Sequence, residues 1–478
     1  MKKLDFFLLF FILTIGIIFR LYKINIPLAD FHSWRQADTA SVAKNFLKNG
    51  FDLLHPKYND LSNIQSGLDN PLGYRMVEFP IYNALFAYLY KIFPYFSLEI
   101  WGRLTSIFFS LIIISLIYYF LLKEKNRLSA FFGSFIYSIM PFFVFYSRVI
   151  LPETTALAFS MISIFFLYFL INNKYKKITN ILFYFLSLIS FSISILIKPT
   201  AIFFIFPLIY LFFKKENFKI LTKFYFYFYF ISAIIPFILW RNYIQNFPEG
   251  IPANQWLITG INTGAGLEKI FFKPAFFRWI FFERINNLIL GGYLTVFLIL
   301  GIMAKSKKYF FYSFLVSILS YLFIFQGGNV QHEYYQILIL PTISIFIGIG
   351  ISFIFENKKI FNFILNSIIV LIIISFSWFF SFYQIKNHYN YSQELIQQAN
   401  IIKSLTLPED KIIVDKTGDT TLLYLSERKG APAIYKDPEE LKKIGYQYLI
   451  TSSINKIEKL KSKYKLIFEN ENFSIFKL

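Results

Sequence analysis

Long apolar runs separated by short polar segments dominate the pattern of this chain. Within the runs the apolar positions are continuous and do not alternate with polar ones, which favours helices over strands. A helix of about 20 residues spans the hydrocarbon core of a bilayer and satisfies its own backbone hydrogen bonds there. The pattern predicts an all-α polytopic membrane protein with eleven transmembrane helices, at about 5–22, 101–122, 128–147, 152–171, 179–197, 199–213, 220–240, 285–303, 309–325, 336–355 and 360–383.

The short connections between these runs are basic on alternate sides, which predicts the orientation of the chain. Lysine and arginine concentrate in cytoplasmic loops of membrane proteins. With the N-terminus inside, every inside loop is basic: Lys2 and Lys3, then residues 123–127, 174–177, 214–223, 305–308 and 358–359. The first run lacks a small-residue cleavage site after it, so we expect a retained helix and not a removed signal peptide. The protein is expected in the plasma membrane, with its chemistry and its C-terminal domain outside.

Three longer segments then fall outside: 23–100, 241–284 and the tail from about 384. Residues 36–47 and 81–93 have helical apolar spacing and are expected to be amphipathic helices on the membrane surface, and a third such helix is expected near 270–283. The tail contains the strand-like runs KIIVD, TLLYL, YQYLI, YKLIF and FSIF, with a helix near 438–444. The predicted domains are therefore a transmembrane domain, 1–383, whose first outer loop is 23–100, and a small extracytoplasmic α/β domain, 384–478.

Composition adds three restrictions. The chain of 478 residues is 56% hydrophobic and 22% aromatic, as expected for a membrane protein. Its formal net charge of +20 reflects the basic inside loops, so no nucleic-acid partner is expected. There are no cysteines, which excludes disulfides and thiol catalysis. No glycine-rich phosphate loop, dinucleotide fingerprint or HExxH motif is present, so no nucleotide cofactor is expected.

Ionisable residues gather at the outer ends of the predicted helices. Asp30 lies in the stretch ADFHSWRQADTA, directly after the first apolar run, and Glu153 and Lys198 each adjoin a proline at the end of a run. Simpler explanations stay open at each position: Asp30 could cap a helix, Glu78 could complement a helix dipole, and Lys198 could extend its ammonium toward water. Carboxylates can also act as general bases or hold a divalent cation, and lysine and arginine can hold a phosphate. This combination suits group transfer from a membrane-embedded phosphate ester.

The order of these elements resembles that of the C-type integral-membrane glycosyltransferases. The similar branches are the protein O-mannosyltransferases (glycosyltransferase family 39) and the aminoarabinose transferases that modify lipid A. The resemblance covers about residues 1–350 and rests on six short motifs in the family's order: Asp30, Glu78-Phe79-Pro80, Gly102-Arg103-Leu104, Glu153, Lys198-Pro199 and His332-Glu333-Tyr334-Tyr335. The first motif departs from the family, which often has Asp-Glu where this chain has Asp30-Phe31, so the acceptor does not carry over.

The resemblance implies a C-type glycosyltransferase fold and a donor sugar on polyprenyl phosphate. Asp30 would be the general base, with inversion at the anomeric carbon, and Glu78 and Glu153 would hold a divalent metal or shape the site. The implied residues for the donor phosphate are Lys198, Arg103, Arg148, His332 and Tyr335. His32, Arg35 and Tyr334 would bind substrate or shape the site. The acceptor would be a glycan, a lipid or a protein.

Three other classes of function remain open from the sequence: a lipid-linked polysaccharide polymerase or ligase, a transporter, and a receptor or adhesion scaffold that uses the tail domain. A lipid-linked polysaccharide polymerase or ligase would use a diphosphate-linked donor, and it would depend more on arginines than on a carboxylate base. A transporter predicts interrupted or charged segments near the bilayer midplane and an inverted repeat. The ionisable residues lie at the helix ends instead, which favours glycosyl transfer.

Overall fold

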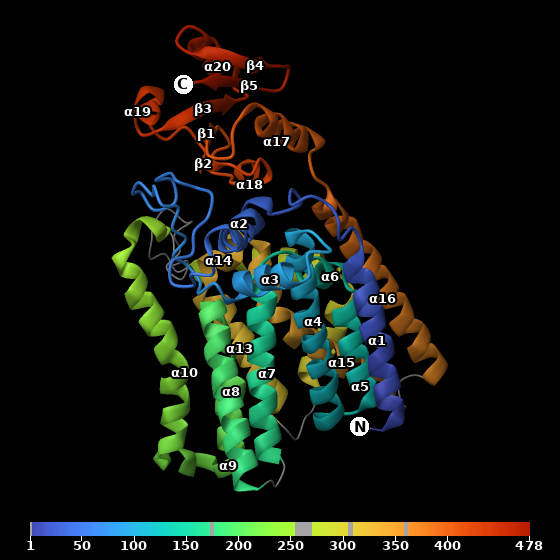
Figure 1. The fold of residues 1–478 in the computed structure, drawn as a ribbon. Coiled ribbons are helices and arrows are strands. Elements are labelled where there is room, and N and C mark those ends of the chain that lie inside the picture. Colours follow the sequence, from blue (N-terminus) through green and yellow to red (C-terminus); the bar gives the residue numbers. More distant parts are fainter. Residues whose placement is uncertain (1, 173–175, 254–269, 305–308, 358–361) are drawn as a thin grey trace. The chain divides into compact units, whose positions relative to one another are not determined.

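A computed structural model shows a largely helical protein that ends in a small sheet (Figure 1). The structure describes residues 2–172, 176–253, 270–304, 309–357 and 362–478. Its contacts divide the chain into two compact units, which we call the helical unit and the mixed unit. The helical unit comprises Met1–Ile24, Arg103–Leu239 and Trp256–Asn387, and the mixed unit comprises Asn25–Gly102, Trp240–Gln255 and His388–Leu478. The mixed unit joins three separate segments of the chain. The predicted domain boundary at residue 383 stays a prediction.

The helical unit contains most of the long helices. Its α-helices, including two that extend beyond it, are α1 (Lys3–Leu21), α4 (Leu98–Glu124), α5 (Arg127–Ile139), α6 (Pro141–Tyr146), α7 (Glu153–Asn172), α8 (Lys177–Ile197), α9 (Ile205–Glu216), α10 (Phe224–Tyr243), α11 (Pro274–Phe277), α12 (Thr295–Met303), α13 (Phe310–Ile324), α14 (Gln326–Gln331), α15 (Leu340–Glu356) and α16 (Phe363–Ile385). Between them lie the 3-10 helices η1 (Pro199–Phe204), η2 (Asn217–Thr222), η7 (Ile270–Phe272) and η9 (Glu333–Ile339), and the π-helix η8 (Arg278–Ile289).

Seven helices in the described part of the chain are long and apolar enough to cross a membrane, and α13 is a shorter apolar helix. The protein is therefore an integral membrane protein, as the sequence predicts. Within the described residues, every predicted run coincides with helical residues. The basic loops at 174–175, 305–308 and 358–359, and the first two residues of the run 360–383, lie outside the described residues.

Three predicted spans are interrupted, each for a local reason. The run 128–147 divides into α5 and α6 at Pro141, which occupies the first turn of α6 because it has no N–H to donate further back. The run 199–213 starts as η1 after Pro199 and becomes α9. The run 285–303 is broken by Gly291 and Gly292, whose φ angles of 58° and 83° are left-handed and end the π-helix before α12 begins.

Glycines let α15 pack closely against two other helices. A Cβ on Gly350 would lie 1.9 Å from the carbonyl oxygen of Phe297 in α12, and one on Gly301 would lie 1.8 Å from that of Phe346 in α15. On another side of α15, a Cβ on Gly348 would lie 2.6 Å from the backbone nitrogen of Gly133 in α5. Small residues at such crossings allow membrane helices to approach backbone to backbone. Helix α15 is therefore the buried centre of this unit.

The mixed unit combines helices from the N-terminal part of the chain with the C-terminal sheet. Its helices are α2 (Ser33–Asn49), α3 (Ile81–Ile92), α17 (Gln393–Leu405), α18 (Thr421–Leu425), α19 (Pro438–Lys443) and α20 (Ile454–Lys461), with the 3-10 helices η3 (Ile244–Asn246) and η4 (Pro248–Gly250); η10 (Lys386–Tyr389) spans the unit boundary. Its strands are β1 (Lys411–Val414), β2 (Lys429–Ala431), β3 (Tyr446–Thr451), β4 (Lys465–Glu469) and β5 (Ser474–Lys477).

The five strands form one mixed sheet in the order β2-β1-β3-β5-β4. β1 is parallel to β2 and β3, whereas β5 is antiparallel to β3 and β4. Alternate residues point to opposite faces of a strand. Accordingly, Ile412 and Val414 join a core with α17 and α18, and Ile413 joins a second core with α19 and α20. The predicted α/β character of the tail is confirmed.

One predicted strand in the tail is wrong. TLLYL forms the helix α18 (Thr421–Leu425). Four consecutive side chains are buried there, Thr421, Leu422, Leu423 and Tyr424, whereas an edge strand would bury only the alternate residues on one face. The short strand β2 takes the edge position instead. Its Gly430 pairs with residues 59–61, accepting a bond from the Leu61 N–H (2.7 Å) and donating to the Asn59 carbonyl (2.9 Å). The loop near Asp60 thus extends the edge of the sheet.

Candidate functional site

Asp30 follows α1 in a series of turns and lies three residues before α2. It is 2% exposed, and the Gln36 side chain donates to its Oδ1 at 2.8 Å. His32 precedes α2 with a φ of 57°, a left-handed conformation that is uncommon for a residue with a side chain. This turn lets Gln36, in the first turns of α2, reach back to Asp30. The sequence nominated Asp30 and His32 but missed Gln36.

Arg35 and Glu78 form a buried ion pair. The guanidinium Nη2 lies 2.6 Å from Oε1 of Glu78, and the side chains are 8% and 13% exposed. Glu78 stands just before α3, and Asn83 of α3 also donates to the Thr39 carbonyl of α2 at 2.7 Å. The two residues that the sequence treated as separate candidates therefore hold α2 and α3 together.

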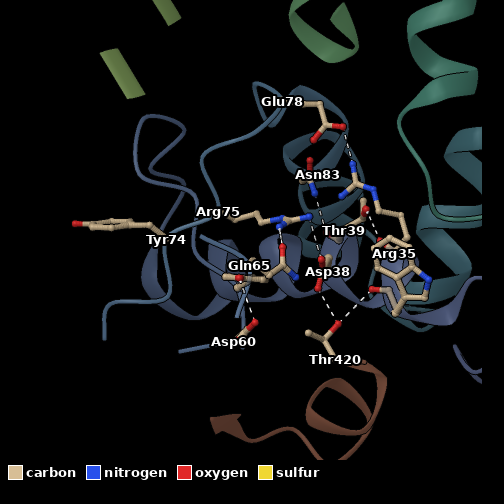
Figure 2. A network of polar contacts seen from close by, with 12 residues as sticks. Arg35, Asp38, Thr39, Asp60, Gln65, Tyr74, Arg75, Glu78, Asn83 and Thr420 are labelled. Carbon is tan, nitrogen blue, oxygen red and sulfur yellow. Dashed lines mark hydrogen bonds and ion pairs between the residues drawn. The ribbon is translucent and has the colours of Figure 1, made fainter. Parts of the chain in front are cut away.

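Asp38 is the centre of the polar network that Figure 2 shows. It lies 3.0 Å from Arg75 and accepts a hydrogen bond from Thr420 at 2.7 Å, and its side chain is fully buried. Thr420 also donates to the Trp34 carbonyl, and Arg75 donates to Gln65. A buried carboxylate costs free energy unless it is paired. These contacts attach α2 to the C-terminal domain, and the sequence missed Arg75 and Thr420 because they lie far from Asp38 in the chain.

The helical unit holds a second buried ion pair, between Glu153 and Lys198. Glu153 begins α7, Lys198 ends α8, and their charged atoms are 2.7 Å apart with the carboxylate fully buried. The ammonium of Lys198 also lies 5.3 Å from the ring centre of Tyr335 in η9, within range of a cation–π interaction. Pro152 precedes the first residue of α7, and Pro199 follows Lys198 at the end of α8, so both side chains stand at helix ends.

Glu333 joins three elements in the same unit. It accepts a hydrogen bond from the Tyr146 hydroxyl at 2.9 Å and pairs with Arg284 at 3.2 Å. The neighbouring His332 stacks on Tyr334, with ring centres 5.1 Å apart and an interplanar angle of 11°. The motif His332 to Tyr335 therefore lies beside α6, α7 and η8. Sequence reasoning missed Tyr146 and Arg284, although Arg284 is an ionisable residue at the start of a predicted span.

Arg103 and Arg148, which the resemblance implies for the donor phosphate, bond backbone carbonyls that follow α1. Both are fully buried. Arg103 donates to the Ile24 carbonyl at 2.7 Å, and Arg148 donates to the Tyr22 carbonyl at 2.7 Å. These two acceptors follow the end of α1, where helix carbonyls lack partners within the helix. The two arginines fix the chain just before the segment that carries Asp30, and their proposed contact with a phosphate stays a prediction.

The two carboxylates predicted for a metal do not share a site within either unit. Glu78 belongs to the mixed unit and pairs with Arg35, whereas Glu153 belongs to the helical unit and pairs with Lys198. Among the residues that the structure describes, no three His, Asp or Glu side chains lie close enough together to hold a metal ion. Glu78 and Glu153 each have a cationic partner, and their role as metal ligands stays a prediction, so we derive no step through a metal.

The predicted residues thus form two sets. The mixed unit holds Asp30, His32, Arg35 and Glu78, and the helical unit holds Arg103, Arg148, Glu153, Lys198, His332, Tyr334 and Tyr335. In each set, buried charges are paired between residues more than 40 positions apart in the chain, and burying charges costs free energy. This arrangement can position a carboxylate and several cations with little freedom of movement.

The comparisons with known proteins agree with the resemblance in the sequence. The family model "Dolichyl-phosphate-mannose-protein mannosyltransferase" matches residues 78–240. No curated protein matches the chain in sequence.

Solved structures show the same fold at low sequence identity. ArnT from Cupriavidus metallidurans, bound to undecaprenyl phosphate, is similar with a TM-score of 0.65 and 10% identity, over 98% of this chain and 97% of that protein. The Archaeoglobus fulgidus oligosaccharyltransferase in complex with Zn and sulfate is similar with a TM-score of 0.63 and 12% identity, over 93% of this chain and 68% of that protein. The same organism's oligosaccharyltransferase AglB, in complex with an inhibitory peptide and a dolichol-phosphate, gives a TM-score of 0.61 and 10% identity, over 94% of this chain and 69% of that protein. The chain therefore has the C-type integral-membrane glycosyltransferase fold and carries a region like glycosyltransferase family 39 at residues 78–240.

Proposed function

We propose that this protein is an inverting membrane glycosyltransferase that moves a hexosyl or pentosyl group from polyprenyl phosphate to an acceptor. The observation that carries the proposal is the buried Asp30 carboxylate, held by Gln36 directly after an apolar helix, in a chain of this fold. ArnT, which shares the fold, was solved with undecaprenyl phosphate, and AglB was solved with a dolichol-phosphate. These lipid phosphates support the same class of donor here.

In the proposed reaction Asp30 acts as the general base. It removes the proton from an acceptor hydroxyl of a glycan, lipid or protein while that oxygen attacks the anomeric carbon. The bond between the anomeric carbon and the phosphate oxygen breaks, and the electron pair leaves with the phosphate. Attack opposite to the leaving group inverts the anomeric centre. A fixed carboxylate supports this role, because general bases act within hydrogen-bond reach of the proton.

The leaving polyprenyl phosphate gains negative charge, which cations stabilise. We propose Lys198 as the principal one, with His332 and Tyr335 beside it in the helical unit. An ammonium group has three donors, so the pairing of Lys198 with Glu153 is compatible with donation to a phosphate. Glu153 then positions Lys198, and Arg103 and Arg148 support the donor phosphate or the chain around it. His32, Arg35, Tyr334 and Glu78 are proposed to bind substrate or to shape the site.

The basic loops support an N-terminus inside the cell and a reaction outside. Outside the membrane no nucleotide sugar is needed, because the lipid carries the activated sugar. A donor of this kind is made inside and presented at the outer surface. The apolar helices then supply the environment for its hydrocarbon tail.

The test is sugar transfer in membranes that contain the wild-type chain or Asp30→Asn. Radiolabelled polyprenyl-phosphate sugars are supplied at the outer surface, and the label is followed into lipid, glycan and protein fractions. We expect transfer by the wild type and a loss of at least about 100-fold in Asp30→Asn, which keeps the size of the side chain but cannot accept the proton. Asp415→Asn is the matched control, because Asp415 bonds Thr451 and Lys456 within the C-terminal sheet domain.

Equal transfer by wild type and Asp30→Asn would remove Asp30 as the base. Transfer from diphosphate-linked donors alone would favour the polymerase or ligase alternative. The labelled fraction identifies the acceptor class, and a chelator added to the same assay measures the metal requirement.

A further inference from the structure

A polar pocket lies wholly within the mixed unit. Its volume is about 460 Å³, and it lies between the C-terminal half of α2, the segment 57–72 and the first residues of β1 and β2. Ligand pockets of proteins commonly have volumes of about 300–1,000 Å³. This pocket is therefore large enough for one or two sugar rings, and none of the residues proposed above for catalysis lines it.

Positive charge is concentrated in the lining of this pocket. Five lysines line the pocket, namely Lys44, Lys48, Lys57, Lys411 and Lys429. Of the residues that the structure describes, only two glutamates, Glu409 and Glu427, line it as well.

Helix α2 explains part of this charge but not the rest. Lys44 and Lys48 lie in the last turns of α2, where cations complement the helix dipole. Lys411 and Lys429 are instead direct partners on the adjacent parallel strands β1 and β2. Like charges directly opposite each other in a sheet are destabilising.

The environment of Lys429 shows the cost of this arrangement. Burial lowers the pKa of Lys429, and the nearby Lys57 and Lys48 lower it further. Burial also lowers the pKa of Lys44, although the ion pair with Glu427 at 3.1 Å opposes this. Glu427 itself is shared with Lys403, which lies 2.9 Å away. An anion in the pocket would relieve the repulsion among Lys48, Lys57 and Lys429.

The remaining lining suits a sugar. Asn45, Asn49 and Asn59 supply amide groups, which can both donate to and accept from hydroxyls. Leu61, Leu72 and Pro408 supply apolar surface against which a sugar ring can pack. Ligand sites commonly combine apolar walls with a few polar groups that fix orientation.

We propose that this lysine pocket binds an acidic sugar, with a carboxylate or phosphate group held by Lys57 and Lys429. The pocket then recognises the acceptor by its negative charge. The claim that the pocket recognises the acceptor rests on the proposed function. The claim that the pocket binds an acidic sugar does not.

Equilibrium binding to the full-length protein in detergent tests the proposal. The probes are glucuronate, glucose 6-phosphate, neutral glucose and inorganic phosphate. We expect both acidic sugars to bind more tightly than glucose or inorganic phosphate, and less tightly as the salt concentration rises. The variant with Lys57→Gln and Lys429→Gln is expected to bind them at least tenfold more weakly. Lys442→Gln, an exposed lysine of α19 outside the pocket, is expected to bind like the wild type.

A second measurement does not need the variants to fold. Because its pKa is lowered, Lys429 should react early with an amine-acylating reagent near neutral pH, and glucuronate should protect it. Asp30→Asn should bind the probes like the wild type, so a failure of transfer leaves this proposal standing. Equal binding of glucose and glucuronate, equal binding by the double variant, or phosphate binding as tight as that of the sugars would each overturn it.

Discussion

At the scale of single residues, the feature that distinguishes this protein is a set of buried charges that are paired over long sequence distances. Lys198 with Glu153, and Arg35 with Glu78, are each pairs of residues more than 40 positions apart in the chain. Desolvation of two charges offsets much of their attraction, so such pairs contribute little net stability. Removing one partner is costly, however, because it leaves the other charge buried.

This asymmetry gives a testable prediction for Glu153. We expect Glu153→Gln to lower the free energy of unfolding by about 3 kcal/mol, because it leaves the Lys198 ammonium buried beside a neutral amide. The double variant with Lys198→Met should lose less than the sum of the two single changes. Equilibrium unfolding of all four proteins in the same detergent gives the coupling energy, and strict additivity would contradict the prediction.

The raised pKa of the buried Asp60 carboxyl predicts that the free energy of unfolding depends on pH. Burial raises the pKa of Asp60 from 3.8 to about 7, although hydrogen bonds from Ser62 oppose this; Asp38 raises it further and Arg75 lowers it. Between about pH 4 and pH 7 the folded state therefore binds more protons than the unfolded chain, so stability falls as the pH rises. At about 1.4 kcal/mol per pKa unit, the full effect is on the order of 4 kcal/mol.

Asp60→Asn should remove this dependence, because the amide does not titrate. Thermal unfolding midpoints of both proteins between pH 4 and pH 8 measure the effect. We expect the variant to gain stability relative to the wild type as the pH rises to about 7 and to stay constant above it. Parallel curves for the two proteins would show that Asp60 does not titrate in this range.

At the scale of elements, glycine decides how the helical unit packs. The sequence shows Gly348 and Gly350 inside an apolar run, where glycine is unfavourable for an isolated helix. The structure supplies the reason: the backbones of α5 and α12 approach α15 at these positions. The apolar run predicts the helix α15. Its packing partners α12 and α5 are set by the glycines at the two helix contacts, Gly350 with Gly301 and Gly348 with Gly133.

We predict that Gly350→Ala destabilises the protein by about 2 kcal/mol or more, because the new methyl group would lie 1.9 Å from the Phe297 carbonyl oxygen. Gly16→Ala in α1 is the matched control. Its methyl group would meet side-chain atoms at 3.3 Å or more, and alanine favours helices. Thermal unfolding in detergent compares the two variants, and equal midpoints would contradict the packing argument.

At the scale of the whole molecule, the basic loops predict the orientation of the chain. The natural sequence has no cysteine, so single cysteines can report it. We expect Ser462→Cys, in the C-terminal domain, to react with a membrane-impermeant maleimide on intact cells. Lys123→Cys, at the end of α4, should react only after the cells are broken. The reverse pattern would invert the topology and place the proposed reaction inside.

The sequence alone determined the class of protein and the type of most elements. Continuous apolar runs predict membrane helices because a bilayer offers the backbone no other partners. The order of short motifs was enough for a resemblance to the C-type glycosyltransferases, which the fold bears out. The short strand-like runs KIIVD and YQYLI, which are bounded by turns, predict strands.

Tertiary structure decided what each polar residue contacts. Nothing local to Glu78 indicates Arg35, and nothing local to Asp38 indicates Arg75 or Thr420, because each pair is formed by elements that the chain brings together only on folding. The same holds for TLLYL, which became a helix when burial on all sides outweighed its preference for a strand. The lysine pocket is likewise absent from any single stretch, since its charges come from four segments. Local sequence sets the elements through backbone preferences and hydrophobicity, whereas buried charges find their partners through packing.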